Sequence, residues 1–433
     1  MNFLIIEEIC LSRLLTPFDK SIFSTFSFIS SIYARQLAAV TPKKYSVRVL
    51  EGVEEIDFTW EYDAIHINFK TATAPKAYQV ADEFRKRGQT VILSGYHPSA
   101  LPEEAKHHAD SVIIGSAERL WPIVVKDLEL GVLKPFYKST GNVNLKAFPP
   151  INIDPSVIKL IDAIEATRGC PYQCEFCQDS NIPDGSVFRT RPIKDVIKEI
   201  ESLPQKIFVF CDTSLTIDPC YTKTLFSHMK GLNKRFICEG NVNVLAKDKE
   251  LLKLSHEAGC IQWMIGFESF AQKTLNSVHK TTNKVREYMH AVKNIHKYNI
   301  AVLGTFIFGF DQDTSDIFET TQEHIDELGL DSAHFAILTP YPGTPLFDRF
   351  KAEGRILTQD WSKYNRKNVV FEPKNMSKEE LYNGFKGIAE TFNSIPKMIY
   401  RDIKSLRLGL YPFLTTSASN LGNYMNRPSK WVH

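Results

Sequence analysis

Residues 166–177 read ATRGCPYQCEFC, and this stretch is the strongest indication of the fold and function of the chain. It holds Cys170, Cys174 and Cys177 with the spacing C-x3-C-x2-C. Three thiolates on one short loop can occupy three corners of a cubane iron–sulfur cluster. Zinc prefers four protein ligands, and no second Cys/His pair stands at zinc-finger spacing. Three thiolates leave one iron open, and an open metal position is typical of a site that acts on a substrate.

Around this stretch, short apolar runs alternate with helical patterns over residues 161–346. The runs end near Gly169, Asp212, Asn241, Ser269, Phe310 and Pro340. Each gap is long enough for a loop, a helix and the next strand. Six parallel strands joined by helices predict a partial (β/α)6 TIM-like barrel, with its chemistry at the carboxyl ends of the strands.

Residues 1–135 show the same alternation with a shorter period. Their apolar runs are Asn2–Ile6, Tyr45–Leu50, Ala64–Phe69, Thr90–Gly95 and Ser111–Gly115. Strand and helix alternating in this way predict an α/β, doubly wound domain, with its ligand at the carboxyl edge of the sheet.

Two further regions complete the organisation. Residues 136–160 carry scattered Pro, Gly and Asn and are predicted to be a linker. Residues 347–433 are predicted to be a mainly helical accessory segment, in which Ser377 and Glu380 form a capping box. The Ser- and Asn-rich tail from Thr415 is expected to fray.

Composition narrows the function classes. The chain has 433 residues and is 43% hydrophobic, which excludes wholesale disorder. Lys plus Arg number 52 and Asp plus Glu number 50, so charge gives no case for a nucleic-acid partner. No apolar run reaches the roughly 18 residues of a membrane-spanning helix, and the N-terminus lacks the pattern of a signal peptide. We therefore expect a cytoplasmic protein.

The cysteine motif resembles that of the radical S-adenosylmethionine (SAM) superfamily. Further segments match the motifs of that family in the same order. They are FCDTSLTID (210–218), AGCIQWMIGFES (258–269), TFIFGF (305–310) and TPYPGTPL (339–346). The resemblance implies a [4Fe-4S] cluster on the three cysteines, whose open iron binds SAM. One electron then cleaves SAM into methionine and a 5′-deoxyadenosyl radical.

The same resemblance implies a set of SAM contacts, and each has a structural alternative. Phe176 would pack near the adenine, and Asp212 would contact the methionine end or cap the next helix. Glu268 would contact the ribose or amino group, or be a buried carboxylate that needs partners. Gly309 would let the backbone approach the adenine or only permit close packing.

The first domain resembles the flavodoxin-like, cobalamin-binding type found in one subclass of this superfamily. The matching segments are SGYHPSALPEEA (94–105) and DSVIIGSAE (110–118). By this resemblance Gly95, His97 and Gly115 would lie near cobalamin, with a locally bonded turn histidine as the alternative for His97. Ser94 and Ser116 depart from the pattern, and the motif D-x-H-x-x-G is absent.

The resemblance therefore implies a cobalamin-dependent methyl transfer to an unactivated carbon of a partly apolar substrate, lipid- or tetrapyrrole-like. The alternatives are a radical SAM oxidoreductase, cyclase or rearrangement enzyme without cobalamin and, more remotely, a non-enzymatic iron–sulfur electron carrier. An electron donor such as flavodoxin or ferredoxin is the expected protein partner.

Overall fold

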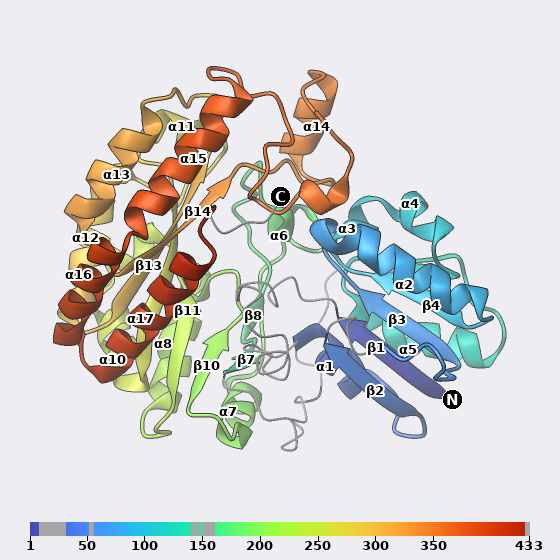
Figure 1. Cartoon of the computed structure of the whole chain (residues 1–433). Coiled ribbons are helices and arrows are strands. Elements are labelled where there is room, and N and C mark those ends of the chain that lie inside the picture. Colours follow the sequence, from blue (N-terminus) through green and yellow to red (C-terminus); the bar gives the residue numbers. More distant parts are fainter. Residues whose placement is uncertain (8–31, 52–55, 140–144, 146–148, 150–160, 429–433) are drawn as a thin grey trace.

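The computed structural model describes residues 1–7, 32–51, 56–139, 145, 149 and 161–428 (Figure 1). Two six-stranded parallel sheets organise these residues. Most of the predicted linker 136–160 and the last five residues of the chain lie outside the described part.

The first sheet has the strand order β2-β1-β3-β4-β5-β6. Its strands are β1 (Asn2–Glu7), β2 (Ser46–Glu51), β3 (Ala64–Asn68), β4 (Thr90–Ser94), β5 (Ser111–Ile114) and β6 (Phe136–Lys138). Every pairing is parallel, and β1 lies between β2 and β3. The order reverses there, which confirms the doubly wound fold and puts the switch point at β1 and β3. The short strand β6 lies within residues 136–160, which the sequence assigned to the linker, and it pairs with β5.

Helices cover both faces of this sheet. On one face α1 (Ile32–Val40) packs beside α5 (Ala117–Glu129), and their apolar side chains form a core around Trp121. On the other face α2 (Ala74–Lys86) and α4 (Pro102–His107) bury Phe84 and Ala105. The short helix α3 (Tyr96–Ala100) begins directly after β4.

The second sheet has the strand order β14-β13-β12-β11-β10-β7. Its strands are β7 (Asp162–Ile164), β10 (Ile207–Phe210), β11 (Arg235–Glu239), β12 (Cys260–Glu268), β13 (Ala301–Phe308) and β14 (Ser332–Ile337). The crossover helices are α7 (Ile193–Ser202), α8 (Pro219–Met229), α10 (Lys249–Ala258), α12 (Tyr288–Lys297) and α13 (Ile317–Leu328), with the short α9 (Val242–Leu245) and α11 (Gln272–Ser277) beside them. In the described part of the chain, β7 and β14 are the two edge strands and do not pair with each other, which confirms a partial barrel.

The C-terminal segment is helical, as predicted. It contains α14 (Pro345–Ala352), α15 (Lys378–Phe392), α16 (Ile395–Ser405) and α17 (Leu410–Met425). Ser377 and Glu380 form the predicted capping box of α15. For the described residues from Thr415 on, the expectation of a frayed tail is wrong, because Thr416 and Asn420 of α17 are fully buried; residues 429–433 lie outside the described part. The amide of Asn420 donates to Asp402 and to the carbonyl of Asp331, so tertiary bonds satisfy the polar residues of this helix.

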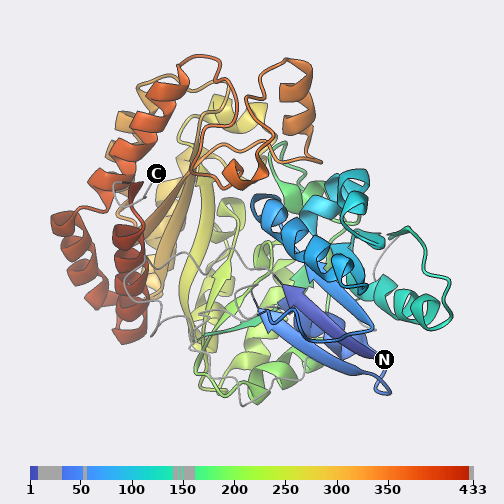
Figure 2. The ribbon, with the colours of Figure 1, turned by 45° about the vertical axis from the view of Figure 1, so that its right-hand side comes forward.

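The two sheets lie side by side, with α16 and α17 on the opposite side of the molecule from the first domain (Figures 1 and 2). Arg168 joins the domains, because it bonds Glu118 of α5, Gln36 of α1 and its own neighbour Glu165. No helix in the part of the chain that the structure describes is long and apolar enough to cross a membrane.

Candidate active site at the cysteine loop

The cysteine loop is held at its base by a short antiparallel ladder. Strands β8 (Thr167–Arg168) and β9 (Arg189–Thr190) pair, and the N–H of Cys170 donates to the carbonyl of Gly185 at 2.8 Å. Gly169 has φ +90°, and a Cβ there would lie 2.1 Å from the carbonyl oxygen of Val187. Only glycine fits this close approach, so the residue before the first cysteine fixes where the loop starts.

The three thiols fit a cluster with three protein thiolates. None is in a disulfide. Burial raises the pKa of all three, that of Cys177 to about 12. Among the described residues no three acidic, His or Cys side chains gather as ligands of one metal ion. A cubane cluster does not need several side chains around one metal ion, because each thiolate binds a different iron.

A cation stands beside the thiols. Burial alone would lower the pKa of Lys280, but Glu268 and the thiols of Cys174 and Cys177 raise it above its ordinary value. Its ammonium lies 3.0 Å from Oε1 of Glu268. Lys280 therefore stays charged and offsets the negative charge that thiolates would carry.

Glu268 lies where β12 leaves its regular register. Its φ is +63°, and the pairing with β13 shifts between Gly266 and Glu268. Such a bulge re-aims a side chain at the end of a strand. The carboxylate is 7% exposed and pairs with Lys280, so it has the partner that a buried charge requires.

Asp212 follows β10 and turns back onto the strand that precedes the cysteine loop. Its carboxylate accepts from the backbone N–H of Ala166 and Thr167 and from the hydroxyl of Thr167 at 2.6 Å. Burial raises its pKa to about 7, against these hydrogen bonds. It caps no helix, since Ser214 and Asp218 cap the next two. The role in SAM binding stays a prediction.

Phe176 packs against Phe310, the residue that directly follows Gly309 at the carboxyl end of β13. The ring of Phe176 contacts that of Phe310, with 5.7 Å between centroids. Gly309 has φ +101°, and a Cβ there would lie 2.8 Å from Leu381 of α15. The positive φ of Gly309 and its close contact with the Leu381 side chain account for a glycine here by local structure.

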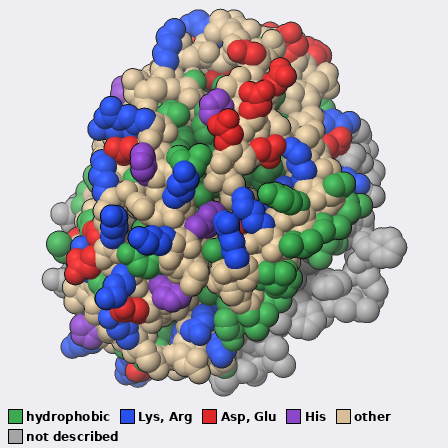
Figure 3. All heavy atoms as spheres, turned by 90° about the vertical axis from the view of Figure 1, so that its left-hand side faces the viewer, with side chains coloured by type: hydrophobic (Ala, Val, Ile, Leu, Met, Phe, Trp, Pro, Cys, Tyr) green, Lys and Arg blue, Asp and Glu red, His purple; other side chains and the backbone are tan. Residues whose placement is uncertain are grey.

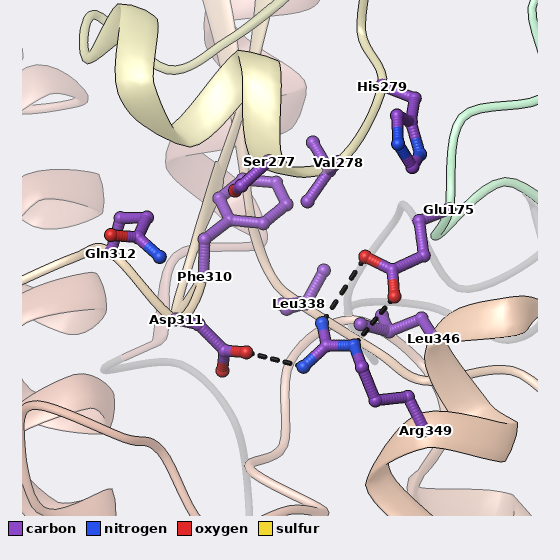
Figure 4. A pocket seen from close by; sticks show the side chains of 10 residues that line it. All are labelled: Glu175, Ser277, Val278, His279, Phe310, Asp311, Gln312, Leu338, Leu346 and Arg349. Atoms are coloured by element: carbon purple, nitrogen blue, oxygen red, sulfur yellow. Dashed lines mark hydrogen bonds and ion pairs between the residues drawn. The ribbon is translucent and has the colours of Figure 1, made fainter.

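A cavity of about 280 Å³ lies against the cysteine loop (Figure 4). Its walls include Glu175 of the loop, His279, Phe310 and Arg349. The guanidinium of Arg349 donates to both carboxylate oxygens of Glu175, at 2.7 and 3.2 Å, and also bonds Asp311. This charged cluster ties α14 to the loop between the second and third cysteines.

The three residues proposed for cobalamin have local roles in the first domain. A Cβ on Gly95 would lie 2.3 Å from the carbonyl oxygen of Phe69, and one on Gly115 would lie 3.0 Å from Cβ of Ser139. His97 is fully buried, and its Nε2 lies 3.0 Å from Glu104. The local hydrogen bond that sequence offered as the alternative for His97 is therefore present, and contact with cobalamin stays a prediction.

The structure adds functional candidates that sequence reasoning missed. Lys280 lies in the loop after α11 and carries no motif of its own. Glu239 ends β11, and burial, with help from Asp179, raises its pKa to about 8 although Lys280 opposes the rise. Glu239 carried a signal in its place at the end of a barrel strand, where chemistry gathers, whereas Lys280 carried none.

Comparison with known proteins agrees with this geometry. Residues 164–325 match the model of the Radical SAM superfamily. The bacteriochlorophyllide d C-12(1)-methyltransferase of Chlorobaculum tepidum is 33% identical over 75% of this chain and 73% of its own. The C-8(2)-methyltransferase of the same organism is 30% identical over 78% of this chain and 79% of its own. The structure of the radical SAM methyltransferase TsrM from Kitasatospora setae, with cobalamin and a [4Fe-4S] cluster bound, has a TM-score of 0.67. That match has 14% identity and covers 81% of this chain and 78% of TsrM.

The chain belongs to the radical SAM superfamily and is an enzyme of that class. Its fold, a doubly wound domain before a partial barrel, is similar to that of TsrM. The family implies a [4Fe-4S] cluster and SAM as cofactors.

Proposed function

We propose that this protein is a cobalamin-dependent radical SAM enzyme that transfers a methyl group to an unactivated carbon of a tetrapyrrole-like small molecule. One observation carries the proposal. The carboxyl edge of the first sheet, where a doubly wound fold binds its ligand, packs directly against the residues that follow the third cysteine.

Four contacts make up this junction. Thr71 after β3 accepts from Gln178 at 3.3 Å, and Tyr96 after β4 donates to Asp179. Gly115 after β5 lies against Pro183, and Ser139 after β6 donates to Asp184. Residues 178–184 directly follow Cys177. A ligand held at the sheet edge would thus lie next to whatever the cysteine loop holds.

The cofactors and the chain have separate tasks in this proposal. When bound, the cluster with SAM would supply one-electron chemistry, and cobalamin would carry the methyl group. The thiols of Cys170, Cys174 and Cys177 would hold the cluster, and Lys280 would balance its charge. Phe176, Asp212, Glu268 and Gly309 would surround SAM, and Gly95, His97 and Gly115 would support cobalamin.

Relatives support the reaction and the substrate class. The two bacteriochlorophyllide d methyltransferases add methyl groups to a tetrapyrrole and cover most of this chain. We also propose that the protein works in the cytoplasm, where a flavodoxin or ferredoxin would supply the electron.

The test uses SAM that carries a deuterated methyl group. Anaerobic protein, reconstituted with iron, sulfide and hydroxocobalamin, is mixed with a reductant and a bacteriochlorophyllide d acceptor. Mass spectrometry should find the deuterated methyl group on the acceptor with the wild-type protein and not with Cys174→Ala. Formation of 5′-deoxyadenosine without labelled product would instead favour the oxidoreductase, cyclase or rearrangement alternative. Labelled product from both proteins would refute the role of the cysteine loop.

A further inference from the structure

The helix pair α16–α17 has its polarity reversed relative to an ordinary surface helix pair. The side that packs inward carries Arg401, Ser405, Thr416 and Asn420, all buried. The side that faces out carries large apolar side chains. These are Ile395, Ile399, Tyr400, Ile403 and Leu406 at α16, and Leu410, Leu414 and Leu421 on α17. We call these eight residues the outer apolar strip.

Several residues of the inward polar side are hydrogen-bonded into the fold, although Nε of Arg401 and the hydroxyl of Thr416 are buried with no hydrogen-bond partner among the described residues. Arg401 donates to the carbonyl of Phe392 at 2.8 Å and to Asn420 at 3.2 Å, and its guanidinium lies over the Phe392 ring. Asn420 in turn donates to Asp402 at 2.7 Å. Asn423 donates to the carbonyl of Ala333 in β14. These bonds fix the rotation of both helices, so neither can roll its apolar side inward.

The outer apolar strip runs along the exposed sides of both helices, which pack against each other. Positions 395, 399 and 403 on α16, and 410, 414 and 421 on α17, recur at helical spacing and so share one side of each helix. Ile403 is 64% exposed and Leu410 is 65% exposed. Single exposed leucines are ordinary, but a strip that spans two packed helices marks a contact surface.

Basic residues lie next to the strip. A groove of about 490 Å³ runs between α12, the end of α13 and the end of α16. It is lined by Lys293, Lys297, Lys404 and Arg407, with Glu327 as the acidic residue among its lining. Arg407 directly follows Leu406 of the strip. Figure 3 shows Lys and Arg side chains on this face beside hydrophobic ones.

We infer that the outer apolar strip and its basic groove seat the protein on the surface of an anionic phospholipid bilayer. Apolar side chains that enter the headgroup boundary, flanked by Lys and Arg, are what a peripheral membrane contact requires. The charge favours lipid over a second copy of the chain, because two such grooves facing each other would bring like charges together. The helices lie on the membrane, since none described here could cross it.

The test is co-sedimentation of the full-length protein with vesicles. One set contains phosphatidylcholine only, and the other mixes it equally with phosphatidylglycerol. We expect binding to the anionic vesicles, weaker binding to the neutral ones, and loss of binding as salt shortens the range of the charges.

Variants separate the two parts of the surface. Ile403→Ser should lower partitioning roughly tenfold, since it removes one large apolar side chain from the contact. Leu130→Ser is the matched control, because Leu130 is equally exposed at 63% but lies beyond α5 in the first domain. Lys297→Gln should lower partitioning to anionic vesicles about fivefold and leave binding to neutral vesicles unchanged.

Two results would overturn the inference. Protein that stays in the supernatant with both vesicle sets would show that the strip does not meet lipid. Protein that dimerises without vesicles, and becomes monomeric as Ile403→Ser, would show that a second copy covers the strip.

Discussion

At the scale of single residues, the cysteine loop depends on side chains that are distant in sequence. The C-x3-C-x2-C spacing alone pointed to Cys170, Cys174 and Cys177. Lys280 was beyond the reach of sequence reasoning, because a lone lysine gains meaning only when the fold brings it beside buried thiols. Asp212 was singled out by the resemblance of residues 210–218 to the family's motif, but its bonds to Ala166 and Thr167 depend on the pairing of β7 and β10.

Replacing any one of the three loop cysteines should abolish cluster binding. Cys170→Ala, Cys174→Ala or Cys177→Ala would leave too few thiolates, so iron after anaerobic reconstitution should fall from about four per chain to a small residue. Cys220→Ala, at an exposed position of α8, is the control and should keep its iron. Iron content is measured by plasma mass spectrometry, and a full iron content in a loop variant would refute the assignment of these cysteines as cluster ligands.

His66 should make the first domain sensitive to acid. It is buried in β3 with Nε2 2.9 Å from the hydroxyl of Ser94, and burial lowers its pKa from 6.5 to about 3. As the pH falls, His66 therefore binds a proton in the unfolded chain before it does so in the folded chain. The stability that the neutral ring confers is complete above pH 6.5 and is lost as the pH falls toward 3, by about 1.4 kcal/mol per pH unit.

Urea unfolding at several pH values checks this prediction. His66→Gln should flatten the loss of unfolding free energy below pH 6.5, whereas His256→Gln, at an exposed position of α10, serves as the control. Equal slopes in the wild type and His66→Gln would contradict the prediction.

At the scale of elements, the sequence predicted the regular parts of both sheets well. Buried parallel strands are near-continuous apolar runs, so β3, β4 and β12 stand out from their neighbours. Strand β6 was missed because three residues are too few to show a pattern. Helix α17 was expected to fray because Thr416 and Asn420 look like loop residues, and only the partners of Asn420 in α16 and before β14 explain its order.

The capping box of α15 should contribute measurably to stability. Ser377 accepts from the N–H of Glu380 at 3.1 Å, and Glu380 accepts from the N–H of Ser377 at 2.7 Å. Ser377→Ala should lower the free energy of unfolding by about 1 kcal/mol. Ser394→Ala is the matched control, because Ser394 is the N-cap of α16 and makes no side-chain cap bond. Equal losses in both variants, by urea denaturation, would argue against the box.

At the scale of the whole molecule, two parallel sheets present their carboxyl edges to one another. Each domain was predictable from its own periodicity. Their mutual placement was not, because it rests on buried polar contacts such as Arg168 with Glu118 and Arg35 with Asp162, at 2.9 and 2.8 Å. Charged residues of this kind look like solvated surface in a sequence.

Arg168 should be the residue whose loss most weakens the contact between the two domains. Its side chain is 11% exposed, and Glu118 and Glu165 are nearly fully buried. Arg168→Met would leave both carboxylates without their cation and should cost about 3–5 kcal/mol of unfolding free energy. Arg87→Met, which removes an exposed pair with Glu83, should cost under about 1 kcal/mol. Similar losses in the two variants would show that Arg168 does not hold the domains together.

In the proposed function, one molecule of this protein holds a cluster and a cobalamin side by side. The chain is reconstituted anaerobically with iron, sulfide and hydroxocobalamin and then desalted. Its iron and cobalt contents are measured, and its visible spectrum is recorded. We expect about four irons per chain together with stoichiometric cobalt in a corrin spectrum. Iron without cobalt would contradict the cobalamin-dependent reaction, and neither metal would contradict the proposed cofactor site as a whole.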